Sequence, residues 1–510
     1  MADGRFHWAA EPEDEAIGPR AAALEGLTEE QRAIVEADIP QGGSLVVRAY
    51  AGTGKTFTLQ RFAEARPTDR LLYLAYNKAI QLDAEGRMPQ HVTSRTTHSL
   101  AFREHGLPYQ KAGQLKGNVP LWRVAKLLGV DVVRAHFVVA TLKAWLASAD
   151  DRVGPEHIPG FVRRYHGEGT KEAKPLPPYA GMAADVWVDM CSLAPKSLPM
   201  THDGYLKLWA LSGPELPWGY ILLDEAQDTT PCVWEVIANQ RARKIVVGDA
   251  AQQIYRWRHA CDSLDIVEQS DDVQTLRLSK SWRFGPAVAD LATTLLKRFR
   301  GETVPVRGNS ELRTRVHTQS PTEACTMLAR GNTAIFRDVV RTLDNTDRTL
   351  GFVGGDHKDY RFPLVADVHA VYSGHPDHAK DPIVRSFSDI EELIEYADKT
   401  SSGDLQQCVK LVDEYGGRIP RILDDVRDRD VGARYGVHVY ATAHKSKGLE
   451  FDVVKLAGDF ASRIEAHRAA PEKGIMTLDE VNLLYVAITR AKERLYIHPA
   501  VMEFIQIGSL

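Results

Sequence analysis

The sequence predicts an α/β protein with parallel sheets and several domains, and three observations lead to this fold class. The chain has 510 residues, whereas one hydrophobic core rarely serves more than about 250–300 residues. Apolar runs are followed by small or acidic residues and then by helical patterns, which is the order of strand–loop–helix units. Long segments between these units also have helical periodicity. We therefore expect mainly helical subdomains inserted into the sheet domains.

The first strand–loop–helix unit contains SLVVRAYAGTGKTFTLQRFAEA, in which an apolar strand gives way to glycines and a Lys-Thr pair. A phosphate-binding loop wraps backbone N–H groups around phosphate oxygens, and its Lys and hydroxyl reach the outer phosphates and Mg²⁺. The following helix adds the partial positive charge of its N-terminus. The usual pattern has Gly where this chain has Ala49, and a turn that only joins strand to helix is the alternative. The predicted loop residues are Ala51, Gly52, Thr53, Gly54, Lys55 and Thr56.

Two adjacent carboxylates, Asp224 and Glu225, follow a second apolar strand in GYILLDEAQDTTP. Such a pair beside a buried strand is costly unless a cation or a reaction uses it. Nucleotide hydrolysis needs one carboxylate for the metal ion and another group that orients water. The pair therefore indicates a hydrolytic site, and an acidic helix N-cap is the alternative.

A third apolar strand, residues 245–247, opens into the polar and aromatic loop AAQQIYRWRHA. Gln252 is placed to reach a terminal phosphate. Aromatic residues between arginines suit base stacking on single-stranded nucleic acid, which makes Tyr255, Trp257 and Arg258 candidate contacts. For Trp257, a position in the hydrophobic core is the alternative.

Composition and charge limit the classes of protein. The chain is 44% hydrophobic and 26% charged, and it has no apolar run near the roughly 18 residues of a membrane span. The net charge of −5 argues against a uniformly basic coat but allows a local positive groove. The five cysteines form no C-x-x-C pair, so we expect inert thiols and no structural metal. The N-terminus lacks the apolar core of a signal peptide, which predicts a cytoplasmic location, nucleoid-associated in a prokaryote.

Nine motifs follow one another along nearly the whole chain, from residue 27 to residue 497. They are LTEEQRAIV, AYAGTGKT, LAYNKAI, TTHSLAF, LLDEAQDTTP, VGDAAQQIYRWRHA, LSKSWRFGPAVA, YATAHKSKGLEFDVV and LLYVAITRAKERLYI. This series resembles that of the UvrD/Rep-type superfamily 1 DNA helicases, and SWRFGP is most similar to the F-box DNA helicase branch. Nine motifs in the right order are highly specific.

The resemblance implies an ATP site between two RecA-like domains. Gln31 would read the adenine edge, and Trp282 would stack on the base in place of the more frequent Tyr. Gly448 lies where the family's backbone approaches the γ-phosphate, and Glu450 matches a ribose contact. ATP and Mg²⁺ are the implied cofactors.

The same resemblance assigns the catalytic groups. Lys55 and Thr56 would hold phosphate and Mg²⁺, Asp224 the water shell of the metal, and Glu225 the attacking water. The γ-phosphate sensors would be Gln252, Arg283 and Arg490. Because both arginines come from the second domain, hydrolysis would depend on closure of the cleft.

The DNA contacts are also implied by the resemblance. Trp257 matches an aromatic residue that stacks on single-stranded DNA. The histidines among the contacts have a structural, hydrogen-bonded role as their alternative. The remaining residues of the implied track are Tyr76, Thr97, His98, Tyr255, Arg258 and His444.

The motifs divide the chain into an acidic extension, residues 1–24, and two RecA-like domains, 25–275 and 276–510. Helical insertions are expected at about 105–215 and about 346–430. The basic stretch FVRRYHGEGTKEAKPLPPYAG in the first insertion is either a loop near DNA or a solvated charge run.

The implied function is an ATP-dependent translocase and helicase that moves 3′ to 5′ on single strands and at single-strand/duplex junctions, in DNA repair or recombination. The second insertion is markedly shorter than in the large members of the family, where it regulates unwinding. The resemblance therefore implies translocation more strongly than unwinding of a duplex. One alternative is the motor subunit of a multi-protein nuclease or phage-defence complex, whose partner would bind through an insertion. Another is an ATP-dependent switch that binds DNA without stepping.

Overall fold

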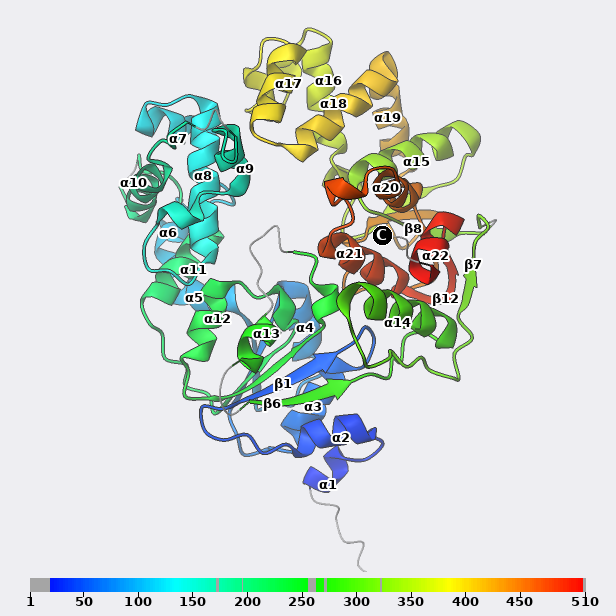
Figure 1. Cartoon of the computed structure of the whole chain (residues 1–510). Helices are drawn as coiled ribbons and strands as arrows, with labels where there is room; N and C mark the ends of the chain where they lie inside the picture. Colours follow the sequence, from blue (N-terminus) through cyan, green and yellow to red (C-terminus); the bar gives the residue numbers. More distant parts are fainter. Residues whose placement is uncertain are drawn as a thin grey trace, which may run out of the picture.

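The computed structural model describes residues 19–170, 174–194, 196–255, 263–269, 273–321 and 323–507. Its strands form two six-stranded sheets, and every pairing between the named strands is parallel. Helical subdomains interrupt both sheet domains, which confirms the predicted fold class (Figure 1). Among the described helices, none is long and apolar enough to cross a membrane.

The first sheet has the order β3-β2-β4-β5-β1-β6. Its inner strands are buried along their length, as expected for parallel strands covered on both faces. Because β5 lies between β4 and β1, the loops at the carboxyl ends of these three strands meet at one edge of the sheet. The strands are β1 (Ser44–Ala49), β2 (Leu71–Ala75), β3 (Val92–Thr96), β4 (Tyr220–Leu223), β5 (Arg243–Gly248) and β6 (Val273–Leu278).

In the described part of this domain, the helices outside the insertion are α1 (Pro19–Ala23), α2 (Glu29–Glu36), α3 (Lys55–Glu64), α4 (Lys78–Glu85), α12 (Pro231–Ala238) and α13 (Ser263–Glu268). The first insertion runs from β3 to β4, with a π-helical turn at Phe102–Gly106. Its helices are α5 (Thr97–Ala101), α6 (Leu107–Lys111), α7 (Leu121–Leu128), α8 (Val132–Ala147), α9 (Gly160–Tyr165), α10 (Tyr179–Cys191) and α11 (His202–Leu211).

Within the first insertion, residues 121–147 form two separate helices, because α7 ends at Gly129 with φ 64° and α8 begins after Asp131. Glycine adopts this left-handed conformation without strain. The Asp131 side chain then accepts a hydrogen bond from the Arg134 N–H and caps α8. Half of the residues of α8 are buried, nearly all of them apolar, and they belong to the hydrophobic core of the insertion.

The second sheet has the order β7-β12-β11-β8-β10-β9. Its strands are β7 (Arg315–His317), β8 (Cys325–Ala329), β9 (Leu350–Phe352), β10 (His438–Thr442), β11 (Phe451–Leu456) and β12 (Ala491–Tyr496). The second insertion separates β9 from β10 and consists of α16 (Phe362–Tyr372), α17 (Ile390–Lys399), α18 (Gly403–Tyr415) and α19 (Ile419–Arg429). The other helices are α14 (Pro286–Arg300), α15 (Asn332–Asn345), α20 (Gly458–Ala469), α21 (Leu478–Ile488) and α22 (Pro499–Gln506).

The expected domain boundary at residue 275 falls inside β6, which pairs with β1 over its whole length. We therefore propose that the first domain ends after Leu278. The loops of the first domain also enter the core of the second, where Tyr50, Ala51 and Ile254 pack in one cluster with helices α14 and α21. The two sheet domains thus share hydrophobic contacts next to the phosphate loop.

The two insertions lie together on one side of the sheet domains (Figure 1). They touch where α8 meets α17: the His136 ring lies edge-on to the Tyr396 ring, with centroids 6.4 Å apart. Val132 and Val133 of α8 pack against the core of the second insertion. The contact links the helical parts of both domains.

Candidate functional site

The loop after β1 has the shape of a phosphate cradle. Gly52 and Gly54 have φ values of 73° and 81°, in the left-handed region that favours glycine. A Cβ on Gly52 would lie 2.7 Å from both the Ser281 Oγ and the Arg283 Cβ. The Trp282 N–H donates to the Gly52 carbonyl at 2.8 Å. Glycine is therefore required where a segment of the second domain lies against the loop.

Asp224 lies at the bottom of the site, 3% exposed, at the carboxyl end of β4. The hydroxyls of Thr56 and Tyr73 donate to its Oδ2 at 2.9 and 2.7 Å. Burial and the neighbouring Glu225 carboxylate raise the pKa of Asp224. A buried carboxylate with this shift gains stability when a cation binds beside it.

Glu225 has a left-handed backbone, with φ 54° and ψ 42°, which is rare for a residue other than glycine. Its Oε1 lies 3.1 Å from the Lys55 Nζ. Burial acts to raise the pKa of Glu225, but the ammonium groups of Lys55 and Lys447 lower it overall. The carboxylate therefore stays ionised, and strain of this kind is characteristic of functional sites.

The donor set fits Mg²⁺. Oxygen atoms of Thr56 and Asp224 are in contact, and the half-buried Glu225 and buried Asp249 carboxylates lie near the same ammonium group, that of Lys55. Hard oxygen ligands and excess negative charge are what Mg²⁺ requires.

Two arginines of the second domain reach the same place. Arg490 is 1% exposed, and its Nη2 donates to the Gln252 Oε1 at 3.1 Å across the domain boundary. Arg283 donates to the Glu450 Oε2 at 3.0 Å and to the Thr489 carbonyl at 3.2 Å. Burial and the nearby Arg283 charge lower the pKa of Arg490 to about 9. Two close guanidinium groups form a site that favours an anion.

The residues expected to bind the base flank Gly54. Gln31 is 3% exposed, and its Oε1 accepts from the Thr28 N–H at 3.1 Å in a capping box at the start of α2. The Gln31 Nε2 lies 3.3 Å from where a Cβ on Gly54 would stand, and Trp282 is the next nearest side chain. Trp282 is 44% exposed, and the Lys280 Nζ lies 4.2 Å from its ring centroid. Gly448, with φ 82°, lies in the loop before β11.

Three residues predicted to contact DNA form one aromatic row across both domains. The rings of Tyr76 and Tyr255 are stacked, with centroids 5.7 Å apart and an interplanar angle of 15°. Tyr255 lies 6.0 Å from the His444 ring, and its hydroxyl donates to the His444 carbonyl at 3.1 Å. Burial lowers the pKa of His444, so its ring is neutral near pH 7. Trp257 and Arg258, expected to extend this row, lie outside the described residues.

Thr97 and His98, also predicted to contact DNA, begin α5 at the carboxyl end of β3. The His98 Nε2 lies 3.3 Å from the Asp203 Oδ1 on α11, and its ring is edge-on to Tyr205. His98 therefore has protein partners, as its structural alternative requires, while its side chain is 40% exposed.

Several residues of the site escaped the sequence reasoning. Lys447 of the second domain pairs with Asp228 and donates to the Gln252 carbonyl at 2.7 Å. The hydroxyls of Tyr73 and Tyr485 reach Asp224 and Asp249. Apart from Tyr73, which lies in an apolar strand, these residues lie within the quoted motifs. Contacts between distant segments leave no local pattern that would have selected them.

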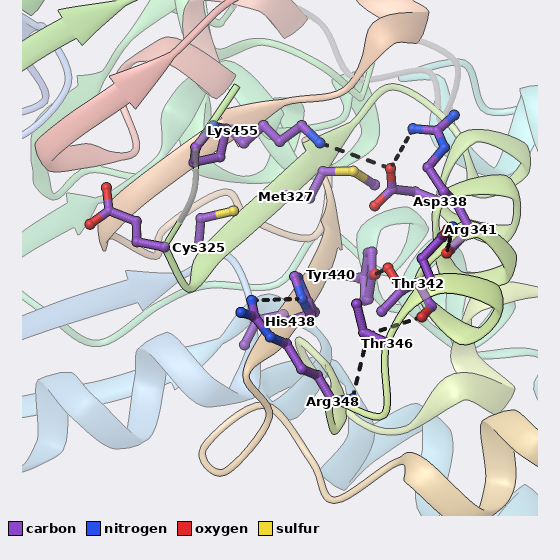
Figure 2. A pocket seen from close by; sticks show the side chains of 14 residues that line it. Cys325, Met327, Asp338, Arg341, Thr342, Thr346, Arg348, His438, Tyr440 and Lys455 are labelled. Carbon is purple, nitrogen blue, oxygen red and sulfur yellow. Dashed lines mark hydrogen bonds and ion pairs between the residues drawn. The ribbon is translucent and has the colours of Figure 1, made fainter. Parts of the chain in front are cut away.

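Two other groups of side chains lie apart from this site. A cavity of about 290 Å³ lies between α15 and strands β8, β10 and β11 (Figure 2). Its charges largely neutralise one another, since Asp338 pairs with Arg341 at 3.2 Å and Lys455 at 3.9 Å.

Asp150, Glu156 and His157 form one group within the described residues with the spacing of metal ligands. The His157 Nε2 lies 2.9 Å from Asp150, and its Nδ1 accepts from the Gly154 N–H at 3.0 Å. Both ring nitrogens are thus engaged by the protein, as in a structural histidine.

Burial raises the pKa of the thiols of Cys191, Cys232, Cys325 and Cys408, so these thiols are unreactive. Cys261 lies outside the described residues.

Comparison with known proteins gives two family matches. The model of the UvrD/REP helicase N-terminal domain matches residues 208–273, and that of the UvrD-like helicase C-terminal domain matches residues 379–501.

Full-length comparisons extend the similarity to most of the chain. F-box DNA helicase 1 of Gallus gallus is 32% identical over 499 residues, covering 92% of this chain and 48% of that protein. F-box DNA helicase protein 1 of Schizosaccharomyces pombe is 31% identical over 530 residues, covering 93% and 58%. The chain thus spans about half the length of these curated relatives. A solved structure of PRRSV helicase matches with a TM-score of 0.32 at 14% identity, over 90% of this chain and 52% of that chain.

Proposed function

Because this chain belongs to the UvrD-like helicases, we propose that it is an ATP-dependent translocase and helicase on single-stranded DNA. It moves 3′ to 5′, takes single-strand/duplex junctions as substrate, and acts in DNA repair or recombination.

One observation carries the proposal: a single site draws its groups from both domains. The phosphate loop, Asp224 and Glu225 come from the first domain, and Arg283 and Arg490 come from the second. The bond from Arg490 to Gln252 joins the two halves. Such a site hydrolyses ATP only when the domains are closed, which couples turnover to their relative motion.

The chemistry assigned to the first domain follows from its contacts. Mg²⁺, held by Thr56 and Asp224, would neutralise charge on the phosphate oxygens. Lys55 exchanges its ion pair with Glu225 for an outer phosphate of ATP. Glu225 is then free to orient the attacking water and accept its proton.

The groups around the phosphates and the base complete the site. Gln252, Arg283 and Arg490 stabilise the charge that develops on the transferred phosphoryl group. Trp282 stacks on adenine, Gln31 reads its edge, and Glu450 contacts the ribose.

The strand track is placed to respond to this site. Tyr255 follows Gln252 by three residues in one loop, and its ring lies between Tyr76 of the first domain and His444 of the second. A movement of this loop changes the stacking surface offered to the bases. Repeated closing and opening then moves the strand in steps.

Two measurements test the proposal. We expect single-stranded DNA to stimulate ATP hydrolysis and strand displacement to occur only on duplexes with a 3′ tail. Equal displacement from 5′ tails would contradict the direction. ATP turnover that DNA does not change would instead identify a binding switch that does not step. Displacement observed only with a co-purified protein would identify the motor subunit of a larger complex.

A further inference from the structure

Helix α21 of the second domain presents polar side chains to a loop of the first. From Val481 to Ile488 the helix is completely buried. Asn482 and Tyr485, one turn apart on the same face, both cross the domain boundary. The Asn482 Nδ2 donates to the Gln253 carbonyl at 2.9 Å. The helix therefore holds the loop that contains Gln252.

The Tyr485 hydroxyl makes two hydrogen bonds, and both end in the nucleotide site. It accepts from the Ala51 N–H in the phosphate loop at 3.1 Å and donates to the Asp249 Oδ2 at 3.1 Å. The same Oδ2 accepts from the Gln252 Nε2 at 2.7 Å. Tyr485 is fully buried, so no water replaces these bonds when they are lost.

These contacts form a continuous path through both domains. It runs from Arg490 to Gln252, from Gln252 to Asp249, and from Asp249 through Tyr485 to the phosphate loop. We propose that Tyr485 is a positioning residue for ATP hydrolysis, which fixes the phosphate loop and the Gln252 loop relative to each other from the second domain. The inference rests on the proposed function and adds a means by which the second domain regulates that site.

The hydroxyl can be separated from the buried ring. Tyr485→Phe keeps the ring and removes both hydrogen bonds. A buried polar group that loses its partner costs about 1–3 kcal/mol, which converts to roughly 5- to 150-fold in rate. We expect kcat of DNA-stimulated ATP hydrolysis to fall by that factor, with KM for ATP changed by less than about twofold. The matched control is Tyr440→Phe, because the Tyr440 hydroxyl bonds to Thr342 inside the second domain at 2.8 Å.

A double-mutant cycle distinguishes positioning from packing. If Tyr485 acts through the Gln252 loop, Tyr485→Phe will have little further effect on single-turnover hydrolysis in a Gln252→Ala background. Both tyrosine variants should melt within a few degrees of each other.

The outcomes that contradict the Tyr485 inference differ from the outcome that contradicts the proposed function. Normal kcat in Tyr485→Phe, fully additive effects in the cycle, or unfolding of that variant alone would overturn the Tyr485 inference while leaving the proposed function intact. If DNA fails to stimulate the wild-type ATPase, the proposed function is rejected together with the inference that rests on it.

Discussion

At the scale of single residues, Glu225 combines a left-handed backbone with a half-buried, ion-paired carboxylate. A backbone of this kind costs about 1–3 kcal/mol and persists when the surrounding structure enforces it. Here the strand end at Leu223 and the Lys55 ion pair supply that constraint. The carboxylate lies 3.1 Å from the Lys55 Nζ of the phosphate loop, which is where the proposed mechanism requires a group that orients water.

The first prediction concerns this carboxylate. Glu225→Gln keeps the shape but removes the base, so we expect ATP binding to persist while turnover falls by at least about 100-fold. Lys55→Ala should weaken both, because its ammonium group serves the phosphate directly. Fluorescent-nucleotide titration and steady-state ATPase assays measure the two effects. Turnover within about threefold of wild type in Glu225→Gln would remove the assignment.

Single residues were predictable from the sequence where a strand end marks them. Lys55, Asp224 and Gln252 each follow an apolar run, and parallel strands bring such positions to one edge. The substitution at Ala49 did not obscure the loop, because that residue ends β1 and lies outside the left-handed turn. Tyr485 and Lys447 were not predicted, because their role depends on which distant loop their helix or turn packs against.

At the scale of elements, helix α21 and Arg490, which follows it, are parts of the second domain that contact the nucleotide site of the first. The second prediction is that Arg490→Ala and Arg283→Ala each lower DNA-stimulated ATPase by at least about 100-fold, in line with the loss of an arginine finger. Affinity for single-stranded DNA, measured by fluorescence anisotropy without nucleotide, should change little.

The control for the arginine variants is Arg429→Ala. Arg429 donates to the Thr346 carbonyl within the second domain, and neither residue is among those assigned to the site. Loss of DNA affinity with normal turnover would show instead that Arg283 and Arg490 contact the nucleic acid.

The contact between the insertions gives a third prediction, on pH. Burial, together with the Lys143 charge, lowers the pKa of His136 to about 4 in the folded protein. In the unfolded chain the pKa of a histidine is about 6.5. Above pH 6.5 the ring is neutral in both states. As pH falls from 6.5 towards 4, the unfolded chain binds the proton first, so the free energy of unfolding decreases.

Urea unfolding at pH 7 and pH 5 measures this effect. We expect wild type to lose on the order of 1–2 kcal/mol more than His136→Phe between these values. The Phe ring preserves the edge-on packing against Tyr396 and does not titrate. Equal losses in the two proteins would show that His136 has no part in the pH dependence.

The elements themselves were predictable to different degrees. Helical periodicity predicted helices in both insertions, although β9 of the second sheet lies inside the range expected for the second insertion. Apolar runs predicted β1, β4 and β5. The predicted end of the first domain, residue 275, falls within β6, because VQTLRL mixes polar and apolar residues at the edge of the sheet and lacks a buried run. The approach of α8 to α17 was not predictable, since it depends on how two separate insertions are oriented.

At the scale of the whole molecule, the two domains share one hydrophobic cluster beside the nucleotide site. Tyr50 and Ala51 of the phosphate loop, with Ala251 and Ile254 of the loop after β5, pack among residues of α14 and α21. The Tyr50 hydroxyl also donates to the Val304 carbonyl of the second domain at 2.7 Å. Apolar contacts of this kind make the stability of each domain depend on the other.

The last prediction follows from that shared core. A non-hydrolysable ATP analogue with Mg²⁺ should raise the Tm of the chain as a single transition, because it binds at loops that belong to the cores of both domains. At a ligand concentration of 100 times Kd the stabilisation is about 2.7 kcal/mol. Differential scanning calorimetry measures it, and Lys55→Ala, which removes the phosphate-binding ammonium group, should abolish the shift. Melting in two steps, of which the analogue moves only one, would show that the domains unfold independently and that the shared cluster does not couple them.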